Sequence, residues 1–217
     1  MKTISAILLT TAIALNGCTS NIVKPTEFGG FLTEYTQLQS TASADGSDTL
    51  RWVSPDFTPS KYSKAHFSPV IFHPKPKISE QVSNTALNDI LVYCDQKIRH
   101  EAKLAGLLNN PDKKRAVSIK MAITGVKIFN EPLKPREIIP IRLVMAGAGA
   151  AIGFRDRNID VYFEIIGEDS LTQVPLFSIV HKINGEQLDS KWDQMEAKHI
   201  QKAFDQFSKK SIAALAK

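Results

Sequence analysis

Cys18 is the residue whose type and position most clearly predict a chemistry for this chain. It ends the sequence Leu15-Asn16-Gly17-Cys18, directly after a short apolar run. A cysteine sulfur is a nucleophile, and a thiol that comes first in an exported chain can be acylated on the outer face of the inner membrane. We therefore predict lipidation at Cys18, with acyl chains of the palmitate type as the membrane anchor.

The residues before Cys18 have the three parts of a cleaved secretory signal. Lys2 is the charged start, residues 4–15 form the apolar centre, and Gly17 is the small residue before the cut. The apolar run is shorter than the about 20 residues of a membrane-spanning helix. The pattern resembles the lipobox of bacterial lipoproteins, with Asn16 as the one departure. The alternative is an ordinary secreted protein that is cut near an unmodified cysteine.

The position of the anchor predicts where the protein lies and how the chain is divided. Two or three acyl chains attach a protein durably, whereas a single chain does so only marginally. By resemblance to the sorting pattern of such lipoproteins, Thr19 in place of aspartate favours the outer membrane of a Gram-negative cell, with the domain facing the periplasm. We expect a signal peptide at 1–17, an acylated cysteine and short polar tether at 18–27, and one domain at 28–217.

The second cysteine, Cys94, has no disulfide partner within the chain once Cys18 is acylated. It falls on the apolar face of a predicted helix, where a free cysteine behaves as a small buried hydrophobic residue. A reactive thiol and an intermolecular bridge are the alternatives.

The other residues that could do chemistry form no recognisable motif. No pair of histidines has the H-E-x-x-H spacing, no cluster has the spacing of a zinc site, and no serine lies in a G-x-S-x-G turn. We interpret the histidines as scattered surface residues and predict neither a metal nor a cofactor. The histidines are His66, His73, His100, His181 and His199.

A glycine-rich apolar stretch at 141–154 admits two interpretations. Gly149 and Gly153 lie four residues apart, a spacing that permits close approach of another backbone. With Gly147 they give G-x-G-x-x-x-G, which is one residue off the dinucleotide fingerprint, and no P-loop lysine follows. We favour close packing or a subunit contact over a phosphate-binding loop.

The charge pattern argues against a nucleic-acid partner. The formal net charge is +5, and the composition, 43% hydrophobic and 23% charged, is that of a globular protein. The basic residues occur in ones, twos and threes without interleaved aromatic residues, so we interpret them as solvated surface.

Apolar periodicity predicts three helices. The first is a short amphipathic helix over 31–38. The second begins at Ser79 as its cap and carries an apolar stripe to Gly106, a typical stop. The last begins near Ser190 and directs Trp192 and Phe204 toward the core.

Strand signals complete the prediction of an α+β fold. Alternation predicts a strand near 117–128, and β-rich runs at 159–166 and 176–183 predict a hairpin. An edge strand is expected within 62–72, and loops at 40–49 and 131–140. The sum is a single domain, a mixed sheet of about four strands covered by helices.

Several short motifs together resemble a family of bacterial lipoproteins grouped as domain of unknown function 3313. These motifs are Gly30-Phe31-Leu32 with Tyr35 and Leu38, Arg51-Trp52-Val53, Tyr62, and Pro69-Val70. The likeness extends over nearly all the mature chain, because the later helix, the strand near 117–128 and the tryptophan-led helix follow in the expected order. The resemblance implies an envelope lipoprotein with no established chemistry.

Two functional hypotheses remain open at this point. The first, which we favour, is a non-enzymatic binding or accessory module that is anchored through Cys18 and docks on an envelope protein or polymer. The second is a periplasmic hydrolase that acts on cell-wall or lipid substrates. A pocket holding a serine or cysteine beside a histidine and an acid would favour the hydrolase.

Overall fold

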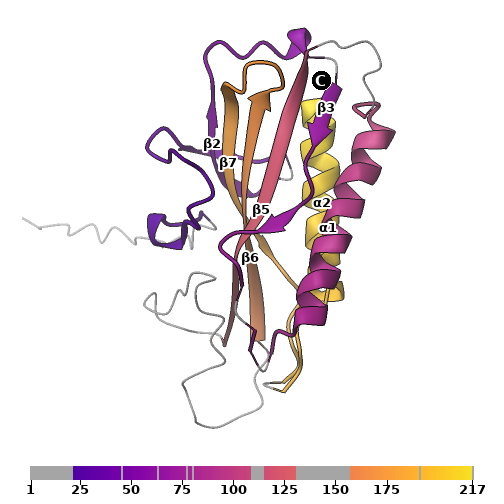
Figure 1. The fold of residues 1–217 in the computed structure, drawn as a ribbon. Helices are drawn as coiled ribbons and strands as arrows, with labels where there is room; N and C mark the ends of the chain where they lie inside the picture. Colours follow the sequence, from indigo (N-terminus) through magenta and orange to yellow (C-terminus); the bar gives the residue numbers. More distant parts are fainter. Residues whose placement is uncertain are drawn as a thin grey trace, which may run out of the picture.

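Two long helices pack side by side against one face of a twisted β-sheet (Figure 1). The computed structural model describes residues 22–44, 46–62, 64–76, 78–79, 81–108, 115–130, 157–190 and 192–216. Cys18 and the glycine-rich stretch at 141–154 lie outside these residues. The fold is a single α+β domain, as predicted, but its sheet has seven strands and not about four.

The sheet is mixed and centred on three long strands. Its order is β1-β2-β7-β6-β5-β3, and β4 pairs with β5. The pairs β1–β2, β2–β7, β7–β6 and β6–β5 are antiparallel, whereas β3 and β4 run parallel to β5. The strands are β1 (Gln39–Ala42), β2 (Asp48–Val53), β3 (Lys64–Phe67), β4 (Ile71–Phe72), β5 (Ala116–Asn130), β6 (Arg157–Asp169) and β7 (Pro175–Asn184).

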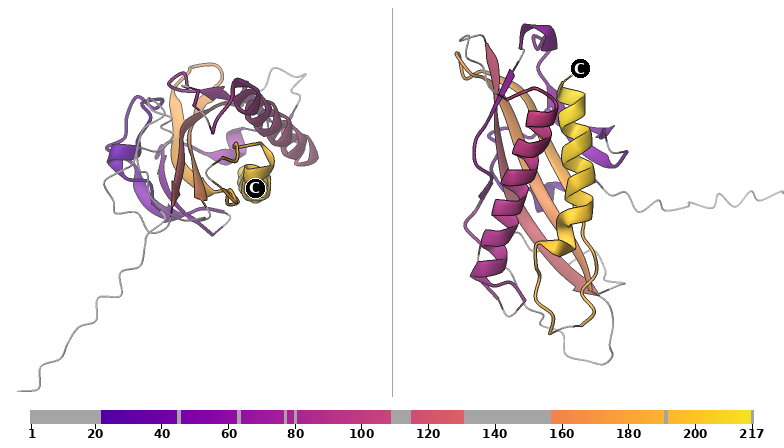
Figure 2. Two further views of the ribbon diagram at one scale, coloured as in Figure 1. Left: turned by 90° about the horizontal axis from the view of Figure 1, so that it is seen from below. Right: turned by 90° about the vertical axis from the view of Figure 1, so that its right-hand side faces the viewer.

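Helices α1 (Asn84–Leu104) and α2 (Lys198–Leu215) cover the same face of this sheet (Figure 2). Helix α1 is also the crossover that a parallel connection from β4 to β5 requires. Two short 3-10 helices, η1 (Pro25–Glu27) and η2 (Pro59–Lys61), lie in the N-terminal part. Within the described part of the chain, no helix is long and apolar enough to cross a bilayer.

The central strands are buried on both faces. On the helix side, Phe163 of β6 packs with Phe204 and Phe207 of α2 in the main core. On the opposite side, Tyr162 and Ile166 of the same strand pack against the N-terminal segment, here defined as residues 22–38. Because both faces are covered, β6 is buried along nearly its whole length.

Helix α1 confirms the predicted apolar stripe but corrects its start. The cap is Ser83, whose hydroxyl accepts a hydrogen bond from the Ala86 amide at 3.1 Å. Ser79 instead forms a bridge with Val82. Gly106, with φ of +69°, follows the end of the helix as expected. Cys94 is fully buried within the stripe, as predicted.

The start of the last helix was also predicted too early. Helix α2 begins at Lys198, and Trp192 is 75% exposed. Met195 is buried in the segment that precedes α2. Its amide donates to the Gln81 carbonyl at 2.8 Å, which links the segment before α2 to the segment before α1. Phe204 lies in the core, as predicted.

Two predictions in the N-terminal third are wrong. Residues 40–49 are not one loop, because they contribute to the hairpin of β1 and β2, closed by a hydrogen bond from the Ser43 amide to the Ser47 carbonyl. Residues 31–38 form no helix. They follow an irregular path across the sheet, which the contacts of Glu164 explain below. The predicted edge strand at 62–72 is confirmed as β3 and β4.

Candidate functional site

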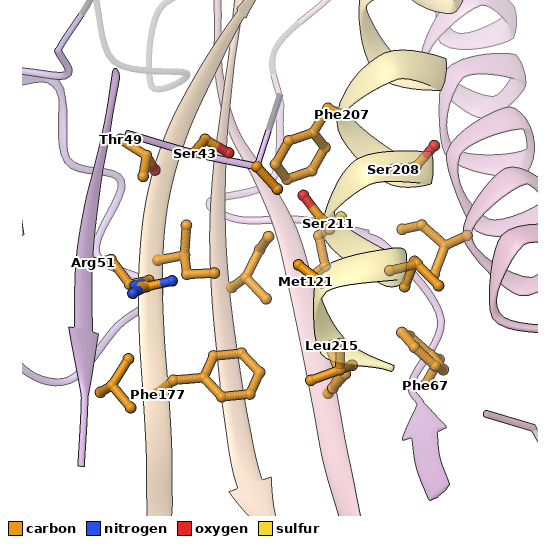
Figure 3. A pocket seen from close by; sticks show the side chains of 18 of the residues that line it. Ser43, Thr49, Arg51, Phe67, Met121, Phe177, Phe207, Ser208, Ser211 and Leu215 are labelled. Atoms are coloured by element: carbon orange, nitrogen blue, oxygen red, sulfur yellow. The ribbon is translucent and has the colours of Figure 1, made fainter. Parts of the chain in front are cut away.

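A mostly apolar pocket lies between the sheet and the C-terminal half of α2 (Figure 3). Its volume is about 220 Å³. This is many times the roughly 10–15 Å³ that a single water molecule needs, so the space is larger than a packing defect. Strands β2 and β7 form one wall, α2 forms the other, and residues 42–44 from the β1–β2 hairpin line it as well.

The lining combines aromatic and aliphatic side chains with a few hydroxyl groups. Ligand pockets in proteins are commonly apolar with a small number of polar groups that orient the ligand. The aromatic lining residues are Phe57, Phe67, Phe177 and Phe207, and the hydroxyl groups come from Ser43, Thr49, Ser68, Ser208 and Ser211.

Arg51 is the one ionisable side chain among the described residues that line this pocket. Successive side chains of a strand point to opposite faces, so Thr49, Arg51 and Val53 of β2 share the face that looks toward α2. The Thr49 hydroxyl already has a partner within the protein, because it donates a hydrogen bond to the Val180 carbonyl at 3.0 Å. Arg51 is exposed and forms no ion pair with a carboxylate of the described residues.

The lining lacks the groups that would activate a serine. Ser211 points toward the cavity, whereas the Ser208 hydroxyl donates to the Asp205 carbonyl of its own helix. Over the parts of the chain that the structure describes, no histidine, cysteine, aspartate or glutamate lines the pocket. Among these lining residues no base is present to take the proton of a serine, which a nucleophilic mechanism needs. The arrangement can bind, and its lining supplies no catalytic pair.

His181 corrects the prediction of surface histidines. It lies on β7, is fully buried, and stacks on Phe207 with ring centroids 4.4 Å apart. The signal was present in the sequence, because His181 continues the alternation of Phe177 and Ile179 on the helix side of the strand. The stacked ring supports Phe207, which lines the pocket.

Cys94 is placed among the core residues and not at a reactive site. Burial, together with the nearby charge of Asp95, raises the pKa of its thiol well above the usual value. The thiolate is the reactive form of cysteine, so this environment keeps Cys94 inert. The described residues also contain no group of three or more histidines, cysteines and carboxylates that could hold a metal ion.

A second polar centre lies on the opposite face of the sheet, around Glu164 of β6. Its side chain is fully buried and is surrounded by neutral donors. The amides of Gly29, Phe31 and Leu32 donate to its two oxygens at 2.5, 2.9 and 3.0 Å. The Tyr35 hydroxyl donates at 2.6 Å, and burial followed by this contact raises the pKa of that phenol.

These contacts determine the path of the N-terminal segment. A helix over 31–38 would direct its first amides along a helix axis, whereas here they converge sideways on one carboxylate. Gly30, with φ of +82°, supplies the left-handed turn within this arrangement. The periodicity of residues 31–38 therefore reflects packing against the sheet and not helix formation.

A related contact holds the start of the same segment. Glu27 is buried and accepts a hydrogen bond from the Tyr162 hydroxyl at 2.8 Å, and Val23 is only 2% exposed. Burial, followed by the charges of Asp160 and Glu27, raises the pKa of Tyr162. Residues 22–27, predicted as the end of the tether, are thus packed on the sheet.

Sequence comparison decides the family. The model of the family described as "Protein of unknown function (DUF3313)" matches residues 27–211. The chain belongs to the DUF3313 family. Two relatives are named "Uncharacterized lipoprotein YdcL", one from Escherichia coli strain K12 and one from Escherichia coli O157:H7. Each is 34% identical over 193 residues, which is 89% of this chain and 87% of the relative. The predicted family resemblance is thereby confirmed.

Solved structures of PelC show a distant likeness to this DUF3313 chain. A point variant of the PelC dodecamer from Paraburkholderia phytofirmans matches with a TM-score of 0.35 and 10% identity, over 77% of this chain and 95% of that one. A PelC dodecamer from the same organism in another crystal form gives a TM-score of 0.33 and 9% identity, over 75% and 96%. Scores this low establish no common fold.

Proposed function

We propose that this protein is a lipoprotein of the outer membrane whose periplasm-facing domain binds a small apolar ligand in the pocket between the sheet and α2. In this account, residues 1–17 are the cleaved signal and Cys18 carries the acyl chains. The domain acts as a binding or accessory module in the envelope. The observation that carries the proposal is an apolar pocket whose lining, among the residues that the structure describes, holds no nucleophile and base pair.

The position of the N-terminal segment supports this division of roles. The segment packs on one face of the sheet, through Val23 and the contacts of Glu27 and Glu164. Helix α2, which forms one wall of the pocket, covers the other face (Figures 1 and 2). The proposed anchor is therefore joined to the domain through a segment that packs on the face opposite α2. The names of the YdcL relatives agree with a lipid-anchored chain.

The hydrolase hypothesis has less support. This hypothesis requires a serine or cysteine beside a histidine and an acid in one pocket. Of these residue types, the described lining contains only serines. The two buried residues that could do such chemistry, Cys94 and His181, are held in the core by apolar and aromatic neighbours.

Photolabelling with an uncharged apolar probe tests the proposed binding site. We would purify the full-length lipoprotein, reconstitute it in phospholipid nanodiscs, and irradiate it with a clickable diazirine fatty alcohol. Labelled peptides should come from the pocket walls on β2, β7 and the C-terminal half of α2. Ser211→Phe places a ring in the cavity and should reduce this labelling about tenfold, which corresponds to about 1.4 kcal/mol.

Ser211→Ala is the matched control, because it removes the hydroxyl without filling the space. It should retain labelling, and thermal unfolding should show that both variants fold. Labelling that is spread over the exposed surface, or that Ser211→Phe leaves unchanged, would contradict a binding function for the pocket.

A further inference from the structure

The charge of the pocket indicates which class of apolar ligand it takes. We propose that the pocket binds a single-chain anionic amphiphile, with its hydrocarbon chain between the sheet and α2 and its carboxylate or phosphate head at Arg51. This inference rests on the proposed binding function and adds the chemical class of the ligand.

Arg51 carries the head-group part of the proposal. Its guanidinium lies on the sheet side of the pocket, across from Ser211 and Leu215 of α2 (Figure 3). No carboxylate of the described residues pairs with it, and no acidic side chain among them lines the same pocket. An arginine presents several donors in a plane that fits a carboxylate or a phosphate, and such charge-assisted hydrogen bonds are stronger than neutral ones.

Hydroxyl groups near Arg51 extend the polar end of the pocket. Ser43 in the β1–β2 turn and Thr49 on β2 line the pocket close to the strand that carries Arg51. Ser43 can donate to an anionic oxygen, since a serine hydroxyl rotates to suit its partner. Arg51 and Ser43 therefore supply the charge and the hydroxyl that the ligand head would contact.

The remaining walls suit a hydrocarbon chain and not a second charge. Phe67, Met121 and Ile165 come from β3, β5 and β6 beneath the helices, and Leu215 closes the α2 side. Strands β6, β5 and β3 follow β2 and β7 across the sheet, so a chain that enters beside Arg51 runs along these apolar side chains. Contact with each methylene group of such a chain is favourable, because it removes apolar surface from water.

The experiment compares head groups on one hydrocarbon chain. The full-length lipoprotein in nanodiscs is labelled with three clickable diazirine probes of equal chain length: a fatty acid, an alkyl phosphate and a fatty alcohol. We expect the wild-type pocket to be labelled by the fatty acid or the alkyl phosphate about tenfold more efficiently than by the alcohol. The arm with the stronger labelling identifies the head group as carboxylate or phosphate.

Arg51→Met should remove this preference, because methionine keeps an apolar stem without the charge. Lys209→Met is the matched control, since Lys209 is an exposed cation on α2 that does not line the pocket. It should keep the preference for anionic probes.

Each outcome separates this inference from the proposed function. Equal labelling by all three probes, or a preference that survives Arg51→Met, overturns the anionic ligand while the binding pocket stands. Pocket labelling by none of the probes overturns both. Loss of the preference in Lys209→Met as well as Arg51→Met assigns the effect to general surface charge and also overturns the role of Arg51.

Discussion

The carboxylate of Glu164 is buried among four neutral donors, three amides and one phenol. A buried charge without a cation is stable only when its hydrogen bonds are complete, because its hydration has been lost. The N-terminal segment supplies these bonds, so the burial of the Glu164 side chain and the position of the segment depend on each other. Glu164 was not singled out from the sequence, since a glutamate in a strand is ordinarily a solvent-facing residue.

We expect Glu164→Gln to destabilise the protein. The glutamine has the same size, but its NH₂ group must face either the Gly29 amide or the donors at the second oxygen, and two donors then oppose each other. The cost should be on the order of 1–3 kcal/mol in the free energy of unfolding. Urea unfolding of the full-length protein measures it as a lower midpoint.

Glu168→Gln is the control for this prediction. Glu168 lies on the same strand, and its partly exposed carboxylate pairs with the exposed Lys120 and not with the N-terminal segment. Such surface pairs contribute little, so this variant should unfold within about 0.5 kcal/mol of the wild type. Equal midpoints for the two variants would show that the Glu164 contacts do not stabilise the segment.

At the scale of elements, the helices and strands that were predicted correctly are those with long apolar patterns. Helix α1 and the strands β5, β6 and β7 were found because their buried positions repeat over many residues. The β1–β2 hairpin was missed because β1 is largely exposed and built from small polar residues. Arg51 could be placed on β2 only once the hairpin was known, so the pocket could not be predicted.

The same limit explains the errors at helix ends and in residues 31–38. Ser79 and Ser190 are both acceptable helix caps. The hydrogen bond between the Met195 amide and the Gln81 carbonyl holds the segments that follow these serines, and each helix begins several residues later. The periodic apolar residues at 31–38 indicate that one side of the segment is buried, but the same pattern is compatible with a helical or an irregular backbone. Long-range contacts of Glu164 decide that question.

Close contact between the N-terminal segment and β5 gives a prediction at the element scale. A Cβ added at Gly29 would overlap the Thr124 Cβ, since the space between the two backbones is too small for both carbon atoms. Gly29→Ala should therefore lift the segment from the sheet and lower the free energy of unfolding by about 1–3 kcal/mol, as overpacking does. Limited proteolysis should show earlier cleavage within residues 22–38.

A double-mutant cycle isolates this contact. Thr124→Gly removes the opposing side chain, so Gly29→Ala should cost far less in that background than in the wild type. If Gly29→Ala costs the same in both backgrounds, its effect does not come from Thr124, and the packing of the segment on β5 is not the cause.

At the scale of the whole molecule, the two faces of the sheet are covered by different parts of the chain. One face of the sheet holds the N-terminal segment that follows the proposed anchor, and the other holds the two helices (Figures 1 and 2). The pocket lies on the helix side, between the sheet and α2. Under the proposed attachment, the anchor would leave the pocket on the other face of the sheet free. The account depends on attachment through Cys18, which precedes the described segment by only a few residues.

Metabolic labelling with a clickable palmitate analogue, followed by density fractionation of the membranes, tests that attachment most directly. We predict that wild-type protein carries the label and sediments with the outer membrane, whereas Cys18→Ser is unlabelled and absent from that fraction. Wild-type protein that is recovered without label, or a Cys18→Ser variant that is labelled and sediments as the wild type does, would contradict the account.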